Sequence, residues 1–469
     1  MTRGAPAQGV LAASHRAVQG GANARCRGLV IAAPSSNSGK TTITLGLCRA
    51  LKKSGIVVQP YKCGPDYIDP AHHSVAAGRT SYNLDNWAMS PELLTDLVAR
   101  GHDADVCLAE GVMGLFDGSG SDGRSGTGST ADLAAFFGWP VVLVVDVSGQ
   151  TETAAAVALG CARYRDDVTI AGVILNQVAG ERHERLVRTG FERVGLPVLG
   201  SIPRGADLKL PERHLGLVQA VELAASEGDR DYIDAIADTI TQHVDLDALM
   251  RLAGDGGGRQ GAEETSTSLP FGMVPPGQRI AIAKDDAFSF MYPHIISMWR
   301  AMGAQVSFFS PLADERPASD ADAVWLPGGY PELFAGRLAA ASHFQTGLRD
   351  MAARSLPIHG ECGGYMVLGR ALEDGDGTVH HMVGLLDLET SYQKRRLHLG
   401  YRIAKLTVDS ALGARGQTII GHEFHYASTV TSDGDALVDC KNARGDAVTE
   451  AGSVRGSVSG TFFHAIDAL

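Results

Sequence analysis

The sequence predicts an α/β protein that consists of two doubly wound domains in series. Three observations predict this fold. Short apolar runs typical of buried parallel strands alternate with segments of helical spacing, many glycines directly follow those runs, and one polar stretch interrupts the alternation. At 469 residues the chain holds about three average domains or two large ones, which excludes a single small domain.

The first domain is predicted over residues 28–247. Residues 1–27 are rich in Ala, Gly, Arg and Gln and show no periodicity, so we expect a disordered leader. The run at 29–33 predicts the first buried strand, and the spacing at 41–53 predicts a helix after it. Similar patterns predict strands at 56–58, 106–109, 141–145 and 170–175, and helices at 91–100 and 151–164.

A linker is predicted over residues 248–278, because this stretch is rich in Gly, Ser, Glu and Pro and has no hydrophobic period. A second α/β series follows and predicts a domain over 279–469. Its first elements are expected as strands at 279–283, 306–309 and 323–326, with a helix at 292–302.

The composition excludes several classes of function. The 41 Lys and Arg residues against 53 Asp and Glu residues give a net charge of −12, which argues against non-specific binding to nucleic acid or an anionic membrane. No run is long and apolar enough for a membrane helix or a signal peptide, so we expect a cytoplasmic protein. The seven cysteines are scattered without a CxxC pair, which argues against structural zinc.

A phosphate-binding loop is predicted at SSNSGKTT, between the first strand and the first helix. Backbone N–H groups of such a loop surround a phosphate, the lysine reaches the β and γ oxygens, and the threonine hydroxyl ligates Mg²⁺. Pro34 stands where the usual pattern has its first glycine. We expect ATP to be bound by Ser38, Gly39, Lys40, Thr41 and Thr42.

Acidic residues follow several predicted strands. KCGPDYIDP places Asp66 and Asp69 in a Gly/Pro loop, and Glu110 ends an apolar strand, where it would hold Mg²⁺. Ordinary turn chemistry is the alternative for each of them. Asp146 is a weaker candidate of the same kind, and Asn176, at another strand end, is a candidate for reading a nucleobase edge.

A thiol nucleophile is predicted in HGECGGYM, where Cys362 sits in a glycine-flanked turn between a strand and a helix. Acyl transfer also needs an oxyanion hole and a base. The backbone N–H groups of Gly329, in LPGGYPE, and of Gly363 are the candidates for the hole, and His464 is the candidate base. A core role is the alternative for His464, and the histidines of GHEFHYA are its rivals.

The segments SSNSGKTT, KCGPDYIDP, EGVMGLFDG, LPGGYPE, HGECGGYM, GHEFHYA and GTFFHAID occur in an order that resembles the cobyrinate/hydrogenobyrinate a,c-diamide synthases of vitamin B12 biosynthesis. The resemblance covers residue 28 to the end. It implies a P-loop NTPase-like domain similar to dethiobiotin synthetase, joined to a class I glutamine amidotransferase domain of the triad type. The implied ligands are ATP with Mg²⁺, L-glutamine and a corrinoid dicarboxylate.

The resemblance also implies roles for individual residues. Cys362 would release ammonia from glutamine with His464 as its base, and the first domain would activate corrinoid acetate groups as acyl phosphates. The substrate carboxylate would meet the γ-phosphate among Asp66, Tyr67, Asp69 and Asp117, and Mg²⁺ would be held by Thr41, Glu110 and Asp66. Ile466 occupies the usual place of the third triad member, which leaves Asp467 and Glu423 as guesses.

Other functions stay open at this point. Cobyric acid synthase and nickel-sirohydrochlorin a,c-diamide synthase have the same domain plan, and a P-loop switch protein with an inactive amidotransferase domain is a more distant alternative. The segment FSFMYPH is similar to the members that act before cobalt insertion, which favours hydrogenobyrinate over cobyrinate. A homodimer is compatible with the sequence, which holds no signal that decides the oligomeric state.

Overall fold

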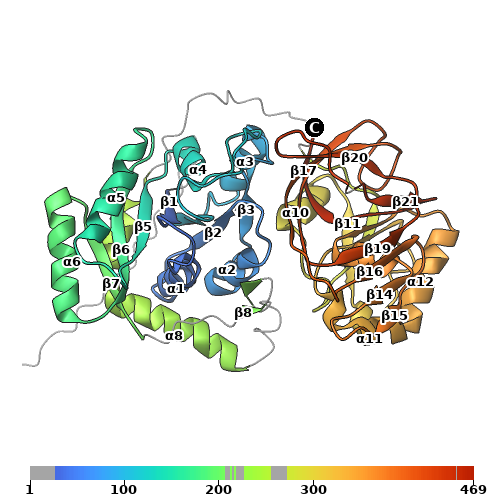
Figure 1. Cartoon of the computed structure of the whole chain (residues 1–469), viewed down its shortest axis with the longest axis horizontal. Coiled ribbons are helices and arrows are strands. Elements are labelled where there is room, and N and C mark those ends of the chain that lie inside the picture. Colours follow the sequence, from blue (N-terminus) through green and yellow to red (C-terminus); the bar gives the residue numbers. More distant parts are fainter. Residues whose placement is uncertain (1–26, 206–211, 214–215, 218–226, 255–271, 450) are drawn as a thin grey trace, which may run out of the picture.

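The computed structural model of the chain describes residues 27–205, 212–213, 216–217, 227–254, 272–449 and 451–469. Figure 1 shows two lobes, an N-terminal one in blue to green and a C-terminal one in yellow to red. Apart from Arg27, the predicted leader lies outside the described residues, as does most of the predicted linker. In the described part of the chain, every helix is too short or too polar to cross a membrane.

A seven-stranded parallel sheet forms the centre of the N-terminal lobe, in the order β3-β2-β4-β1-β5-β6-β7. Its inner strands are buried on both faces, which explains why they read as continuous apolar runs in the sequence. The strands are β1 (Gly28–Ala32), β2 (Val58–Cys63), β3 (Tyr82–Leu84), β4 (Val106–Glu110), β5 (Val141–Asp146), β6 (Ile170–Val178) and β7 (Val198–Pro203), and a separate short pair is β8 (Glu212–Arg213) with β9 (Gly216–Leu217).

Helices pack on both faces of this sheet, so the predicted doubly wound fold is confirmed. One face is covered by α1 (Lys40–Lys53), α2 (Asp69–Ala77), α8 (Glu227–His243) and α9 (Leu246–Leu252). The other is covered by α3 (Pro91–Ala99), α4 (Thr130–Phe137), α5 (Thr153–Tyr164) and α6 (Glu181–Val194).

Helix α9 corrects the predicted start of the linker at residue 248. Leu249 of this helix is fully buried in the first domain's core, and the backbones of Gly254 and Gly28 exchange two hydrogen bonds. The first domain therefore continues to Gly254. A helix of seven residues has only about two turns, so its hydrophobic periodicity is hard to recognise in a sequence next to a Gly-rich run.

The C-terminal lobe is built on a six-stranded sheet in the order β11-β10-β12-β13-β22-β21, parallel except for β21. These strands are β10 (Arg279–Ala283), β11 (Gln305–Phe309), β12 (Ala323–Leu326), β13 (Ile358–Glu361), β21 (Ser453–Arg455) and β22 (Val458–Thr461). The helical elements are α10 (Pro293–Ala301), α11 (Ala335–Ala340), α12 (Ser342–Ala353) and α13 (Gly363–Leu368), with the 3₁₀ turns η1 (Pro311–Ala313) and η2 (Pro331–Leu333).

Two further four-stranded sheets complete this lobe, and the pattern of apolar runs did not predict them. One has the order β15-β14-β16-β19, and the other, which is antiparallel, has the order β20-β17-β18-β23. Their strands are β14 (Ala371–Glu373), β15 (Val379–His381), β16 (Leu388–Ser391), β17 (His398–Leu406), β18 (Thr418–His425), β19 (Ser428–Ser432), β20 (Val438–Asn442) and β23 (Phe463–Ala468).

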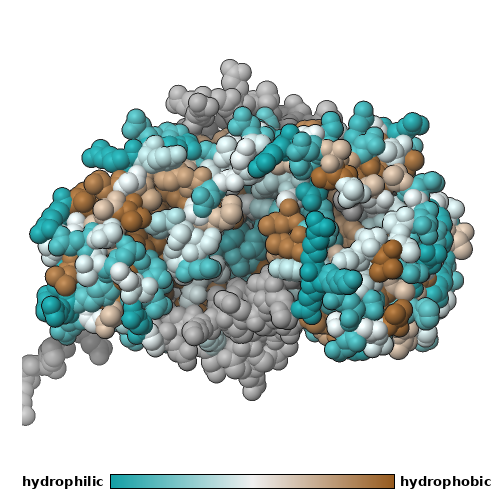
Figure 2. Space-filling model, in the orientation of Figure 1, coloured by the Kyte–Doolittle hydropathy of each residue, from teal (hydrophilic) through white to brown (hydrophobic). Residues whose placement is uncertain are grey.

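The two lobes contact each other through the antiparallel sheet. Tyr401 of β17 stacks on Trp87 of the first domain with ring centroids 4.1 Å apart, and its hydroxyl donates to Asp85 Oδ1 at 3.0 Å. Asp467 of β23 forms an ion pair with Arg124. Beside this contact, Figure 2 shows a recess between the lobes, with a hydrophilic floor and a hydrophobic patch on the wall formed by the C-terminal lobe.

Candidate active sites

The predicted phosphate loop connects β1 to α1, so the helix N-terminus faces the loop. Gly39 caps the helix with φ of 91°, and a Cβ there would lie 2.4 Å from Asn176 Nδ2, so this position requires glycine. The Lys40 ammonium donates to the carbonyl oxygens of Met113 at 2.6 Å and Ser35 at 3.3 Å. Burial lowers the pKa of Lys40, and the nearby Glu110 opposes that shift.

Glu110, at the end of β4, is the centre of a buried polar cluster. Its Oε1 accepts hydrogen bonds from Thr41 Oγ1 at 2.5 Å and from Lys62 Nζ at 2.9 Å. Its Oε2 lies 2.6 Å from His73 Nε2. Lys62 also donates to Asp69 Oδ2 at 2.6 Å, so its ammonium bridges the two carboxylates. Neither Lys62 nor His73 is among the predicted site residues, although Lys62 opens the KCGPDYIDP segment.

These contacts fix the charges of the cluster. Burial alone would lower the pKa of Lys62, but Asp69 and Glu110 outweigh burial and raise it well above its ordinary value. Burial alone would raise the pKa of Glu110, but Lys62 and His73 outweigh burial and lower it. The cluster therefore holds a buried ammonium between two carboxyl groups, of which Glu110 is kept ionised.

The predicted oxygen donors for Mg²⁺ differ in how they lie around the P-loop. Asp69, not Asp66, lies beside the P-loop threonine, with 3.5 Å between Thr41 Oγ1 and Asp69 Oδ2. Asp66 Oδ1 instead accepts from the backbone N–H groups of Ile68 at 2.7 Å and Asp69 at 3.3 Å. Burial, followed by the charge of Asp69, raises the pKa of Asp66 to about 7. Two carboxylates and one hydroxyl remain, and this hard-oxygen set fits Mg²⁺.

Three other predicted residues of this domain lie around the loop. Asp117 Oδ2 accepts from Gly114 N at 2.9 Å, and its charge acts on Lys40. Asn176 donates through Nδ2 to the Ser38 carbonyl at 2.9 Å, so its amide holds the P-loop. The expected role of Asn176, reading a nucleobase edge, did not include this contact. Asp146 Oδ1 accepts from Ser148 N at 2.8 Å, which is turn chemistry.

Cys362 occupies a strained turn between β13 and α13, with φ of 48° and ψ of −105°. The turn is so tight that a Cβ at Gly364 would lie 2.0 Å from the Leu326 carbonyl oxygen. Such a turn presents the side chain at the end of the sheet and at a helix N-terminus. Burial, followed by Glu332, raises the pKa of the Cys362 thiol, so the nucleophile needs a base.

The structure brings His464 and both predicted oxyanion-hole glycines to this turn. A Cβ at Gly328 would lie 3.2 Å from Cys362 Cβ and 2.3 Å from His464 Cε1, so both side chains lie beside Gly328. A Cβ at Gly363 would lie 3.1 Å from the Gly329 amide nitrogen. Burial, followed by His422, lowers the pKa of His464 to about 3, which keeps the imidazole neutral and able to accept a proton.

Glu361, which directly precedes Cys362, is the carboxyl group nearest to the imidazole among the ion pairs of the described residues. Its Oε2 lies 3.8 Å from His464 Nδ1, and its Oε1 accepts from Ala465 N at 2.8 Å. Neither of the two guesses for the third triad member forms an ion pair with His464 in the described part of the chain. Asp467 pairs with Arg124 across the domain interface, and Glu423 pairs with Arg402. The sequence feature that could have identified Glu361 is its position directly before Cys362.

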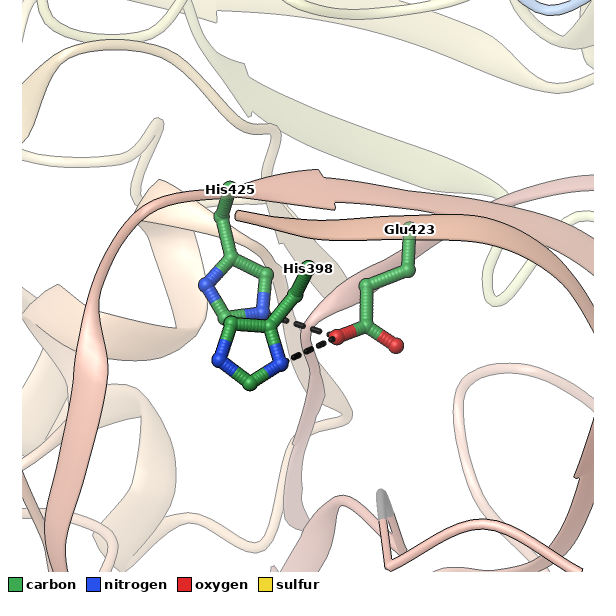
Figure 3. A group of neighbouring side chains, drawn as sticks. All are labelled: His398, Glu423 and His425. Atoms are coloured by element: carbon green, nitrogen blue, oxygen red, sulfur yellow. Dashed lines mark hydrogen bonds and ion pairs between the residues drawn. The ribbon is translucent and has the colours of Figure 1, made fainter. Parts of the chain in front are cut away.

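The rival histidines of GHEFHYA lie elsewhere around this site. His422 pairs with His464 across β18 and β23, whereas His425 bonds to Glu423 Oε1 at 2.9 Å. Figure 3 shows both imidazoles, of His398 and His425, facing one carboxylate oxygen of Glu423, and the three side chains lie close enough together to be considered as metal ligands. The two imidazole rings are stacked at 4.6 Å with 2° between their planes. Because a ligated ion lies in the plane of each imidazole, this geometry fits a hydrogen-bonded cluster and not a shared metal.

Glu361 predicts a pH dependence of glutamine hydrolysis. Burial raises its pKa to about 8, so the carboxyl is neutral at lower pH and ionised above it. Only the ionised form stabilises the imidazolium that arises when His464 takes the thiol proton. We expect kcat/KM, measured as glutamate release, to rise with pH through about 8 and this step to be absent in Glu361→Gln. An unchanged step in that variant would contradict the assignment.

The structure also corrects the expected place of Tyr67. The resemblance places this residue where the substrate carboxylate meets the γ-phosphate, but its side chain lies in the amidotransferase site. Its ring centroid is 4.5 Å from that of His464, and its hydroxyl donates to the Phe424 carbonyl at 3.3 Å. No local sequence pattern could reveal this contact, because it joins residues 357 positions apart.

Two family models match the chain. One describes a CobQ/CobB/MinD/ParA nucleotide binding domain and covers residues 29–218, and the other describes a CobB/CobQ-like glutamine amidotransferase domain and covers residues 279–468. Among solved structures, the chain is similar to PurLQS from Thermotoga maritima at 15% identity and a TM-score of 0.27, over 40% of this chain and 86% of that one. That likeness is too weak to add to the assignment.

Curated relatives match nearly the whole chain. Hydrogenobyrinate a,c-diamide synthase of Rhodobacter capsulatus is 54% identical over 440 residues, which cover 94% of this chain and 98% of that protein. The synthase of the same name from Mesorhizobium japonicum is 52% identical over 443 residues, with the same coverage. Because about half of all positions are identical across both domains, the chain belongs to the hydrogenobyrinate a,c-diamide synthase family.

Proposed function

We propose that this protein uses ATP and glutamine to convert the a and c acetate carboxylates of hydrogenobyrinate into amides. One observation carries the proposal: two reactive sites lie at the same domain interface of one chain. The first is the P-loop with its buried carboxylate cluster, and the second is the cysteine elbow with its neutral histidine. The first supplies an activated carboxylate and the second supplies ammonia. The near-full-length similarity to synthases of this name supports the substrate.

At the elbow, the Cys362 thiol would attack the side-chain carbonyl of glutamine while His464 takes its proton. The N–H groups of Gly329 and Gly363 would stabilise the oxyanion. The imidazolium would then protonate the leaving nitrogen, so that ammonia departs and a thioester remains. Water would hydrolyse the thioester, releasing glutamate and restoring the thiol.

At the P-loop, a corrinoid acetate oxygen would attack the γ-phosphorus of ATP, which forms an acyl phosphate and releases ADP. This step is needed because a free carboxylate is a poor electrophile toward ammonia, whereas phosphate is a good leaving group. Lys40 would neutralise the phosphate oxygens, and Lys62 would hold Asp69 and Glu110 in place. Mg²⁺ held by Thr41, Glu110 and Asp69 would offset the phosphate charge.

The exposed segment 394–399, which leads into β17, is our candidate for contacting the macrocycle. Leu397 and Leu399 are exposed at 47% and 56%, and the exposed residues Lys394, Arg395 and Arg396 precede them. Leu399 pairs directly with Phe424, whose carbonyl bonds to Tyr67. An apolar surface flanked by cations suits an apolar ring system that carries peripheral carboxylates.

Mass spectrometry of the corrinoid tests the proposal. With ATP, Mg²⁺ and glutamine, we expect hydrogenobyrinate to exchange two hydroxyl groups for two amino groups, and to stay unchanged when ATP is omitted. Parallel incubations with cobyrinate and nickel-sirohydrochlorin test the sibling activities. A protein that amidates none of these acids would contradict the proposal, and one that also lacks glutaminase activity would favour a P-loop switch.

A further inference from the structure

Tyr67 belongs to the first domain by its backbone and to the amidotransferase site by its side chain. It lies in the loop between β2 and α2, directly after Asp66 and two positions before Asp69. Only 7% of the residue is exposed. Because the loop is anchored at the P-loop cluster, Tyr67 bridges the two sites.

On the amidotransferase side, Tyr67 contacts the catalytic pair. Its ring stacks on Phe290 at 4.5 Å and 29°, and lies against His464 at 4.5 Å and 33°. Its hydroxyl donates to the Phe424 carbonyl, which is also 4.0 Å from Cys362 Sγ. The ring therefore forms one wall of the position that His464 occupies, and the hydroxyl fixes the ring to the strand beside the thiol.

On the P-loop side, the same turn is tied to the phosphoryl-transfer cluster. Asp66 Oδ1 accepts hydrogen bonds from the two N–H groups that follow Tyr67, and Asp69 is held by Lys62. Tyr292 adds a bond across the interface, from its hydroxyl to the Pro65 carbonyl at 2.7 Å. If these bonds persist, a shift of Asp69 toward a nucleotide or carboxylate would also shift the Tyr67 ring.

We propose that Tyr67 is the positioning residue that makes glutamine hydrolysis respond to the phosphoryl-transfer site. This inference rests on the proposed function. The ring acts through His464: when ATP and the acceptor occupy the first site, the Asp66–Asp69 turn sets the ring, and the ring sets the imidazole against Cys362. Substrate binding at the P-loop site and glutamine hydrolysis at the elbow are thereby coupled, and the coupling depends on the Tyr67 side chain.

The test measures moles of glutamine hydrolysed per mole of amide formed, and glutaminase rates with and without ATP, Mg²⁺ and hydrogenobyrinate. In the natural protein we expect the ratio to be near one and hydrolysis to be stimulated by the other substrates. Tyr67→Ala should lose this stimulation and raise the ratio at least about threefold, since it removes both the ring and its hydrogen bond. Its amidation with ammonium chloride should stay within about threefold, because the P-loop cluster is intact.

Two variants keep the test decisive. Tyr67→Phe retains the ring and loses only the bond to Phe424, so a smaller rise in the ratio is expected even if the alanine variant does not fold. Tyr401→Phe is the matched control, because it removes another interdomain tyrosine bond, to Asp85, without touching His464. It should leave the ratio unchanged.

The outcomes separate this inference from the proposed function. If the natural protein forms the amide but neither Tyr67 variant changes the ratio or the stimulation, the inference is overturned and the proposed function stands. The inference is also overturned if the rate of glutamine hydrolysis in the natural protein is the same with and without ATP and hydrogenobyrinate. If no amide forms with glutamine or with ammonium chloride, the proposed function itself fails.

Discussion

Replacing Cys362 with alanine is expected to lower glutamine-dependent amidation at least about 10³-fold, while amidation with ammonium chloride continues near the natural rate. The nucleophile is lost, but the P-loop cluster belongs to the other domain and keeps its contacts. The strained backbone at Cys362 accommodates alanine no worse than cysteine, because both carry a Cβ at φ of 48°. The measurement is the initial rate of amide formation with each nitrogen source.

Cys161→Ala serves as the control for this prediction, because Cys161 lies on α5, away from both sites. Both rates should match those of the natural protein. Loss of the ammonia-dependent rate in Cys362→Ala, with an unchanged unfolding temperature, would show that the thiol acts in the synthetase reaction as well. That result would contradict the division of labour between the two domains.

Lys62→Met is expected to give the opposite pattern. It leaves Asp69 and Glu110 as buried carboxylates without their common cation, so amidation should fall about 10²- to 10³-fold with either nitrogen source. Glutamine hydrolysis without the other substrates should change little. Removing one member of a buried ion pair also destabilises a protein by about 3–5 kcal/mol, so denaturant unfolding should show a clear loss.

Lys53→Met is the matched control, because its ammonium pairs with Asp234 and Asp238 on the surface and should affect neither rate. A second variant, Lys62→Met with Asp69→Asn, removes one of the orphaned charges. It should regain part of the stability without regaining activity. Amidation within about threefold of the natural rate in Lys62→Met would refute the role assigned to this lysine.

The fold class and the two chemistries could be predicted from local sequence patterns. Parallel strands buried on both faces appear as short apolar runs, and the loops after them carry functional residues at one sheet edge. SGKT after the first run and Cys362 between glycines are local patterns, because a phosphate loop and a nucleophile elbow each need particular residues at adjacent positions. Their order along the chain matched one family.

Which side chains contact each other in the two sites depends on how the chain packs in three dimensions. Asp69 instead of Asp66 beside Thr41, and Glu361 beside His464, follow from how the β2–α2 loop and β13 pack. Tyr67 enters the amidotransferase site because the two domains dock through residues far apart in the sequence. Local patterns report a residue's neighbours within a few positions, whereas these contacts depend on strand order and domain packing, which no local spacing encodes.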